Sequence, residues 1–184
     1  MRRNICEGGK RKVELLDVYD GNGKVTGRKI VRGDKNVKFD KDEHIAVAVI
    51  FIENSKGEFL IQKTSSEKGG EFSSTGGHVD SGETPLQAIE REVEEELGVN
   101  IDKKEIKPLG FLLFDMPLRF LFYVKKDIDI KDVKLQKEEV DYVKYMSVDE
   151  VRNLIKTQKM TKSHALMFEE LLKKVNCQNA NVKL

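Results

Sequence analysis

The sequence predicts one layered domain of the α/β or α+β class, in which strands are mixed with three helices. Two segments carry this prediction. The continuous apolar run at 44–52 is typical of a strand buried on both faces. Residues 84–97 have the end signals and the apolar stripe of a helix. A length of 184 residues suits a single domain with a sizeable core and short terminal extensions.

Further strands are predicted on both sides of the apolar run. Near the N-terminus, two strand-like runs flank a turn cluster at 20–23, so residues 13–33 are expected to form a hairpin. Later in the chain, strands are expected at 58–63, 110–114, 120–124 and 140–146.

The helix at 84–97 has the clearest end signals in the chain. Thr84 is a good N-cap, Pro85 suits the first helical position, and Gln87 completes a capping box with Thr84. Gly98 follows the last turn, where a left-handed residue is favoured. One stripe of this helix is apolar and is expected to pack on the sheet: Leu86, Ile89, Val93 and Leu97.

Two more helices are predicted near the C-terminus, one from a cap at Ser147 to about 157 and one over roughly 163–175. The resulting division of the chain is an N-terminal extension with the hairpin at 1–40, a main domain at 41–176 and a C-terminal tail at 177–184.

The composition excludes several classes of function. The 33 basic residues nearly cancel the 32 acidic ones, and a net charge of +1 gives no electrostatic reason to expect binding to nucleic acid or to a membrane. No apolar run approaches the roughly 20 residues that span a bilayer. Cys6 and Cys177 lack the spacing of metal ligands or of a disulfide framework, which favours a reduced, cytoplasmic compartment.

The acidic residues of the helix at 84–97 are the first candidates for chemistry. Glu92, Glu95 and Glu96 lie at i, i+3 and i+4 and are therefore expected to converge on one stripe, whereas Glu94 points to solvent. Clustered carboxylates repel one another, and Mg²⁺ prefers such oxygen ligands. The spacing alone is also typical of a simple solvated face, so it does not decide between the two interpretations.

The surrounding residues make the pattern far more specific. Gly77 is followed by five residues and Glu83, then by seven residues and the run 91–99, which reads REVEEELGV. All nine fixed positions over 23 residues are similar to the Nudix box, G-x5-E-x7-R-E-U-x-E-E-x-G-U, where U is a bulky aliphatic residue. The resemblance implies an α/β/α sandwich around a mixed β-sheet.

The resemblance also implies roles. Nudix hydrolases cleave a nucleoside diphosphate linked to another moiety, by attack of water on phosphorus with the help of Mg²⁺, and Mn²⁺ is an alternative cation. The resemblance makes Glu92, Glu95 and Glu96 the expected metal ligands and Glu92 one candidate for the general base. Arg91 and Glu83 are expected to pair and to hold the loop against the helix.

Other site residues are expected just outside the helix. The resemblance implies that a backbone carbonyl near Gly76 completes the metal coordination and that Gly77 and His78 face the substrate. Some family members take the base from a later loop, and here Glu138 or Glu139 could supply it, although an exposed charged loop is an equally good interpretation. The expected partner is a small-molecule diphosphate, bound by a monomer or a homodimer.

Two alternatives stay open. A second resemblance, to isopentenyl diphosphate isomerases, rests on the segments 44–49, 56–61 and 76–78. In those enzymes histidines matching His44 and His78 bind metal, but the catalytic cysteine would fall at about Gly76, and Asp115 is the only carboxylate near 111–122. Hydrolysis is therefore favoured over isomerisation. The other alternative is a catalytically silent module that binds a diphosphate.

Overall fold

The computed structural model describes residues 13–114 and 116–181, with the side chains of the last helix described as far as 175. Cys6 and the side chain of Cys177 lie outside this part of the chain, so the prediction that they form no disulfide stays a prediction.

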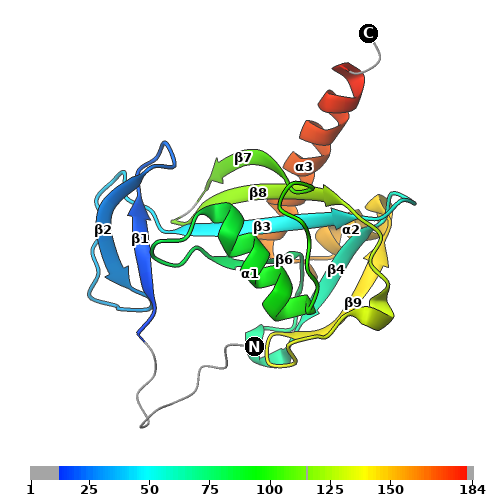
Figure 1. Cartoon of the computed structure of the whole chain (residues 1–184), viewed down its shortest axis with the longest axis horizontal. Helices are drawn as coiled ribbons and strands as arrows, with labels where there is room; N and C mark the ends of the chain where they lie inside the picture. The colour runs from blue at the N-terminus through cyan, green and yellow to red at the C-terminus, as the bar shows by residue number, and fades with distance from the viewer. Residues whose placement is uncertain (1–12, 115, 182–184) are drawn as a thin grey trace.

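A seven-stranded mixed sheet forms the centre of the molecule (Figure 1). Its main path runs in the order β5-β4-β3-β8-β7, with β6 pairing to β3 and β9 to β4. Only the pairing of β3 with β8 is parallel among these ladders. The strands are β3 Ala46–Glu53, β4 Phe59–Thr64, β5 Phe72–Ser73, β6 Thr75–His78, β7 Lys107–Leu113, β8 Leu118–Lys125 and β9 Val140–Met146.

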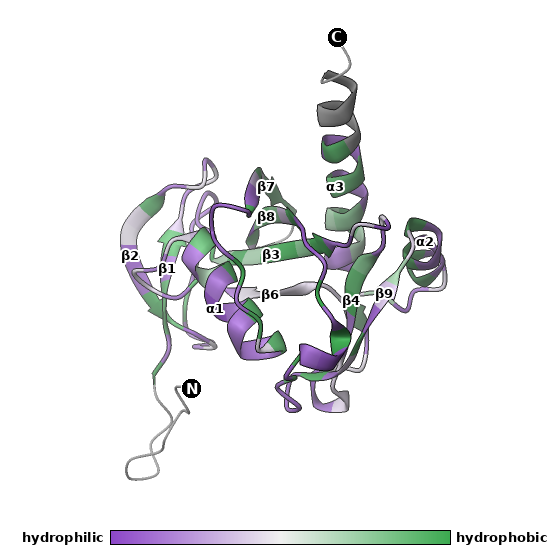
Figure 2. Ribbon diagram, turned by 45° about the vertical axis from the view of Figure 1, so that its right-hand side comes forward, coloured by the Kyte–Doolittle hydropathy of each residue, from purple (hydrophilic) through white to green (hydrophobic). Residues whose placement is uncertain are grey.

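Helices cover both faces of this sheet. Helix α1 (Pro85–Leu97) packs on one face, and α2 (Val148–Lys156) and α3 (Lys162–Asn181) pack on the other. Alternate residues of β3 point into the two cores, Ile50 towards α1 and Phe51 towards α3. Figure 2 shows β3 apolar along its length, as expected for a strand buried on both faces. The predicted α/β/α sandwich around a mixed sheet is therefore confirmed.

The predicted ends of α1 are confirmed in detail. Thr84 Oγ1 accepts the backbone N–H of Gln87, the Gln87 side chain accepts the N–H of Thr84, and Gly98 adopts a left-handed conformation with φ 64°. Helix α3 differs from its prediction because it continues past 175 to Asn181. The sequence has no glycine or proline at 176–181 to end it, so the predicted tail begins inside the helix.

The N-terminal hairpin is also confirmed, as a separate two-stranded antiparallel sheet of β1 (Leu15–Tyr19) and β2 (Val25–Val31). It is packed against the main domain. Tyr19 is buried, exchanges backbone hydrogen bonds with His44 and places its ring against Phe120 at a centroid distance of 5.9 Å. The hairpin thus belongs to the folded body, although the sequence suggested an addition to it.

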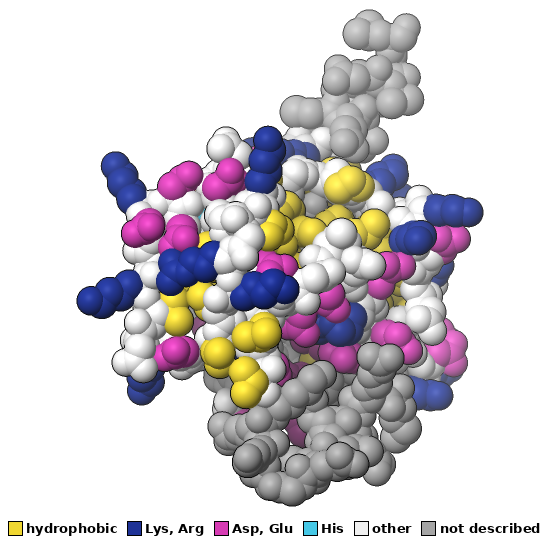
Figure 3. All heavy atoms as spheres, turned by 60° about the vertical axis from the view of Figure 1, so that its left-hand side comes forward, with side chains coloured by type: hydrophobic (Ala, Val, Ile, Leu, Met, Phe, Trp, Pro, Cys, Tyr) yellow, Lys and Arg dark blue, Asp and Glu magenta, His cyan; other side chains and the backbone are white. Residues whose placement is uncertain are grey.

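The surface agrees with the balanced charge of the sequence. Figure 3 shows basic and acidic side chains interspersed over the face that carries the hairpin, with apolar side chains among them. Within the described part of the chain, none of the helices has the length and hydropathy needed to cross a membrane.

Candidate active site

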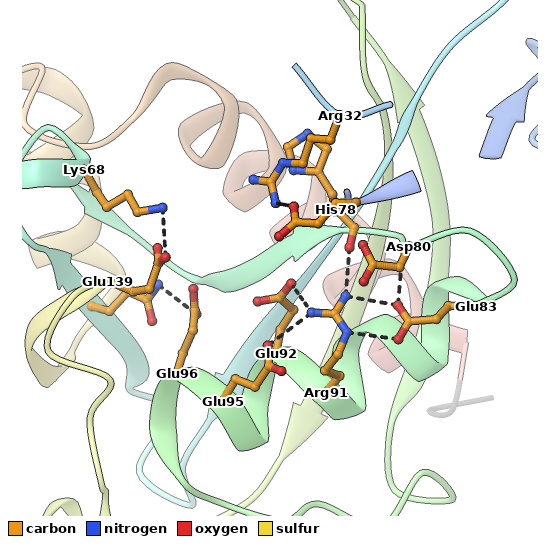
Figure 4. Close-up of polar contacts among 12 residues, drawn as sticks. Arg32, Lys68, His78, Asp80, Glu83, Arg91, Glu92, Glu95, Glu96 and Glu139 are labelled. Carbon is orange, nitrogen blue, oxygen red and sulfur yellow. Dashed lines mark hydrogen bonds and ion pairs between the residues drawn. The ribbon is translucent and has the colours of Figure 1, made fainter. Parts of the chain in front are cut away.

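Arg91 on α1 is the centre of a charged network (Figure 4). Its guanidinium donates to both carboxylate oxygens of Glu83, from Nε at 2.9 Å and from Nη2 at 3.0 Å. Nη1 donates to Glu92 at 2.7 Å and to Glu95 at 3.3 Å, and Nη2 also donates to the carbonyl of His78 at 2.9 Å. The pairing of Arg91 with Glu83 that the motif implied is present, and it ties the loop before α1 to the helix and to β6.

The half-buried network shifts the pKa values of Arg91 and Glu92. Burial alone lowers the pKa of Arg91, but hydrogen bonding to Glu83 and the charge of Glu92 outweigh burial and raise it. Burial raises the pKa of Glu92, and the charge of Arg91 opposes that rise. The Arg91 guanidinium therefore supplies the positive charge beside these carboxylates.

Glu96 lies in a different environment, in the buried layer between α1 and the sheet. Only 7% of Glu96 is exposed, and its Oε2 accepts a hydrogen bond from Gln62 Nε2 at 3.1 Å. Gln62 Oε1 in turn accepts from Thr75 Oγ1 at 3.1 Å. Burial and the nearby charge of Glu92 raise the pKa of Glu96 to about 8.

The three acids that were predicted to converge have different partners in this structure. Glu92 and Glu95 lie on the side of Arg91, whereas Glu96 lies on the side of Glu139 (Figure 4). Helical spacing placed them on neighbouring positions, but Arg91 of the same helix binds Glu92 and Glu95, whereas Gln62 of β4 binds Glu96. Within the described residues, no three His, Cys, Asp or Glu side chains are close enough in this arrangement to surround one cation.

Gly76 and Gly77 form part of strand β6, which pairs with β3. Glycine has a low strand propensity, so no strand was predicted at these two residues. Close approach explains both glycines. A Cβ at Gly77 would lie 2.2 Å from Oε1 of Glu92, and one at Gly76 would lie 2.3 Å from the carbonyl of Ala48. The first contact brings the backbone directly against a predicted metal ligand.

The loop before β9 reaches the same region. Glu139 is half-buried, forms an ion pair with Lys68 at 2.8 Å, and is close enough to influence both Glu92 and Glu96 electrostatically. Glu138 is exposed. Of the two loop acids, Glu139 is thus the one that the fold brings to the site.

The two candidate histidines have separate surroundings. Nδ1 of His44 lies 3.1 Å from the carbonyl of Met116, and its backbone pairs with the hairpin. His78 follows Gly77 on β6, and burial together with the charge of Arg32 lowers its pKa to about 4. His78 is therefore a neutral imidazole at neutral pH.

Sequence reasoning missed two residues that hold the site together. Gln62 follows three apolar residues of β4 and precedes Lys63 and Thr64, so its polarity did not mark it in the sequence as a buried hydrogen-bond donor. Asp17 on the hairpin contacts the loop before α1, and an isolated aspartate in a strand gives no signal of this contact either.

Comparison with known proteins gives the class and then the family. Residues 42–171 match the model of the NUDIX domain. An uncharacterised Nudix hydrolase of Listeria monocytogenes is 33% identical over 147 residues, which cover 77% of this chain and 85% of the relative. By class, the chain is a hydrolase that cleaves the pyrophosphate bond of acid anhydrides. It belongs to the Nudix family, whose members hydrolyse a nucleoside diphosphate linked to another moiety and generally use divalent metal cations.

Solved structures agree with this fold. A crystal structure from Deinococcus radiodurans has a TM-score of 0.70 at 22% identity and covers 85% of this chain and 98% of that chain. An Ap4A hydrolase of C. elegans has a TM-score of 0.53 at 18% identity, covering 71% of this chain and 98% of that chain.

Proposed function

We propose that this Nudix hydrolase acts on a small-molecule diphosphate with Mg²⁺, or alternatively Mn²⁺, held by Glu92, Glu95 and Glu96 and by the backbone carbonyl of Gly76. The observation that carries the proposal is the burial of Glu96 beside Glu92. Two neighbouring acids in a desolvated site repel each other, and a divalent cation removes that cost.

The cation would neutralise the diphosphate oxygens and activate the attacking water. Arg91 and Glu83 position the ligands, since their bidentate pair leaves neither group free for proton transfer. Arg91 also donates to Glu92 at 2.7 Å and to Glu95 at 3.3 Å, so it would orient both carboxylates toward a bound cation. Either Glu92 or Glu139 serves as the base, and both lie within the same cluster.

His78 and Gly77 are proposed to face the substrate. A neutral imidazole can donate one hydrogen bond to a phosphate oxygen and adds no charge to the site. Gly77 leaves space beside Glu92 that any side chain would fill.

Hydrolysis is favoured over isomerisation by one specific contact. The isomerase resemblance places a cysteine at about position 76, and here even a Cβ at that position would lie 2.3 Å from the carbonyl of Ala48. The backbone of β6 is too close to β3 to accommodate a reactive side chain at position 76.

A screen of diphosphate compounds with detection of phosphate or pyrophosphate tests the proposal. We expect turnover with Mg²⁺, its loss on chelation, and its recovery when Mg²⁺ is restored. Undiminished activity in excess chelator would contradict the metal assignment. No turnover across the panel and no metal binding by calorimetry would favour the silent module, and allylic product from isopentenyl diphosphate would favour the isomerase.

A cytoplasmic location and a monomeric or homodimeric state are further proposals, based on the positions of the two cysteines and on the balanced charge. Size-exclusion chromatography with light scattering tests the second.

A further inference from the structure

The N-terminal hairpin is hydrogen-bonded to the loop at 79–84, which leads from β6 into α1. Asp17 on β1 is only 6% exposed, and both of its carboxylate oxygens accept hydrogen bonds from this loop. Oδ1 accepts from Ser81 Oγ at 2.9 Å, and Oδ2 accepts from the backbone N–H of Gly82 at 2.8 Å. The carbonyl of Leu15 accepts the N–H of Ser81 at 2.8 Å, so β1 holds the loop at three points.

These contacts are the main compensation for burying the Asp17 carboxylate. Its ion-pair partner is Lys29, whose Nζ lies 3.9 Å away on a side chain that is 56% exposed. A pair of this length, with its lysine largely in solvent, stabilises a protein only weakly. A buried carboxylate is costly unless it is hydrogen-bonded, so the positions of Asp17 and of the two loop donors depend on each other.

The loop passes this constraint to the helix. Glu83 directly follows Gly82, and it exchanges hydrogen bonds with Asp80 at 3.0 Å and 3.3 Å. The Glu83 carboxylate then accepts two hydrogen bonds from Arg91, and Arg91 donates a further one to Glu92 at 2.7 Å. Hydrogen bonds and the one peptide link between Gly82 and Glu83 therefore lead from the hairpin to a proposed metal ligand.

We propose that Asp17 is a positioning residue for the hydrolase site, acting through the loop, Glu83 and Arg91. The match to the NUDIX domain begins at residue 42, so Asp17 lies in the extension that precedes it. The extension thereby forms part of the catalytic apparatus. The proposal rests on the proposed function, because its consequence for turnover requires Glu92 to bind the cation.

Asp17→Asn is the first test, because asparagine keeps the shape of the side chain but replaces one acceptor with a donor. The matched control is Asp42→Asn. Asp42 is exposed and accepts the N–H of Gly21 in the hairpin turn at 3.2 Å, a similar bond that does not involve the loop. Ser81→Ala removes one loop donor and carries the same test if Asp17→Asn fails to fold.

The full chain with saturating Mg²⁺ is used for kcat and KM, and Mn²⁺ binding is measured by calorimetry. We expect Asp17→Asn to lower kcat by about tenfold, with KM changed by less than about twofold, and to weaken Mn²⁺ binding by about tenfold. Hydrogen exchange at the amide of Gly82 should accelerate. Ser81→Ala should change kcat, Mn²⁺ affinity and the exchange rate at Gly82 in the same direction but by less. Asp42→Asn should leave these three quantities unchanged.

A double variant shows whether Asp17 acts through Glu83. Combining Asp17→Asn with Glu83→Gln should lower kcat no further than the larger single effect, because both changes release the same loop. The proposal would be overturned if the loss of kcat in the double variant equalled the product of the two single losses. Native kcat together with native Mn²⁺ affinity in Asp17→Asn would also overturn it. If the native chain hydrolyses no diphosphate, the proposed function fails, but Mn²⁺ affinity and Gly82 exchange still decide the role of Asp17.

Discussion

The two ends of the acidic cluster on α1 have opposite means of stabilisation. At one end, Glu92 and Glu95 bind the guanidinium of Arg91, which provides positive charge in the absence of metal. At the other end, Glu96 is buried and accepts a hydrogen bond from the neutral side chain of Gln62. One motif therefore contains an end where carboxylates are balanced by a guanidinium and an end where burial favours the neutral form of a glutamate.

The largest effect is expected from Glu95→Gln, which removes a charge at the end bound to Arg91. We expect kcat to fall by about a hundredfold or more, because a proposed metal ligand is lost while the exposed side chain contributes little to folding. Steady-state kinetics with Mg²⁺ and circular dichroism measure the two effects. Glu94→Gln, one residue away and exposed, is the control and should keep native kcat. A fully active Glu95→Gln would contradict the metal assignment.

Arg91→Lys separates the positive charge of Arg91 from its bidentate hydrogen-bond geometry. Lysine keeps the positive charge but cannot make the bidentate contact to Glu83, so we expect kcat to fall by about tenfold. The control is Arg152→Lys, which alters a similar pair with Glu169 on the exposed surface and should leave kcat unchanged. Equal kcat for both variants would show that charge alone suffices at position 91.

The raised pKa of Glu96 predicts that metal binding depends on pH. Its pKa of about 8 means that the metal-free protein holds a proton there at neutral pH, and a metal ion binds the ionised form. Metal affinity should therefore rise with pH up to about 8, by at most about tenfold per pH unit. Calorimetry in buffers with different ionisation enthalpies measures the released proton. Release of a full proton by Glu96→Gln would assign it to another group.

The smallest effect concerns the free energy of unfolding of the metal-free protein. Between the ordinary pKa of 4.5 and the raised value of about 8, the folded state keeps a proton that the unfolded state has released. Stability therefore falls as pH rises through this window. Glu96→Gln should remove that slope and be more stable than the native chain above about pH 8, by on the order of 1–3 kcal/mol. Denaturant unfolding across the window tests this, and an unchanged slope would contradict it.

Local sequence determined the elements and the family. The caps of α1, its apolar stripe and the spacing of Glu83, Arg91 and the glutamates are properties of a short segment, because capping and the 3.6-residue repeat act between near neighbours. The same holds for the hairpin, whose turn lies between its two strands. These features were predictable without knowledge of the rest of the chain.

Only the tertiary structure decided how the acids of that segment differ. Glu96 is buried because it meets Gln62, 34 residues earlier, and the loop before α1 is held by Asp17, 64 residues before Ser81. The strand β6 forms because β3 supplies its partner, although its glycines disfavour a strand. Burial and hydrogen-bond partners depend on which distant segments pack together, so helical spacing could place three carboxylates on neighbouring positions but could not assign their charge states.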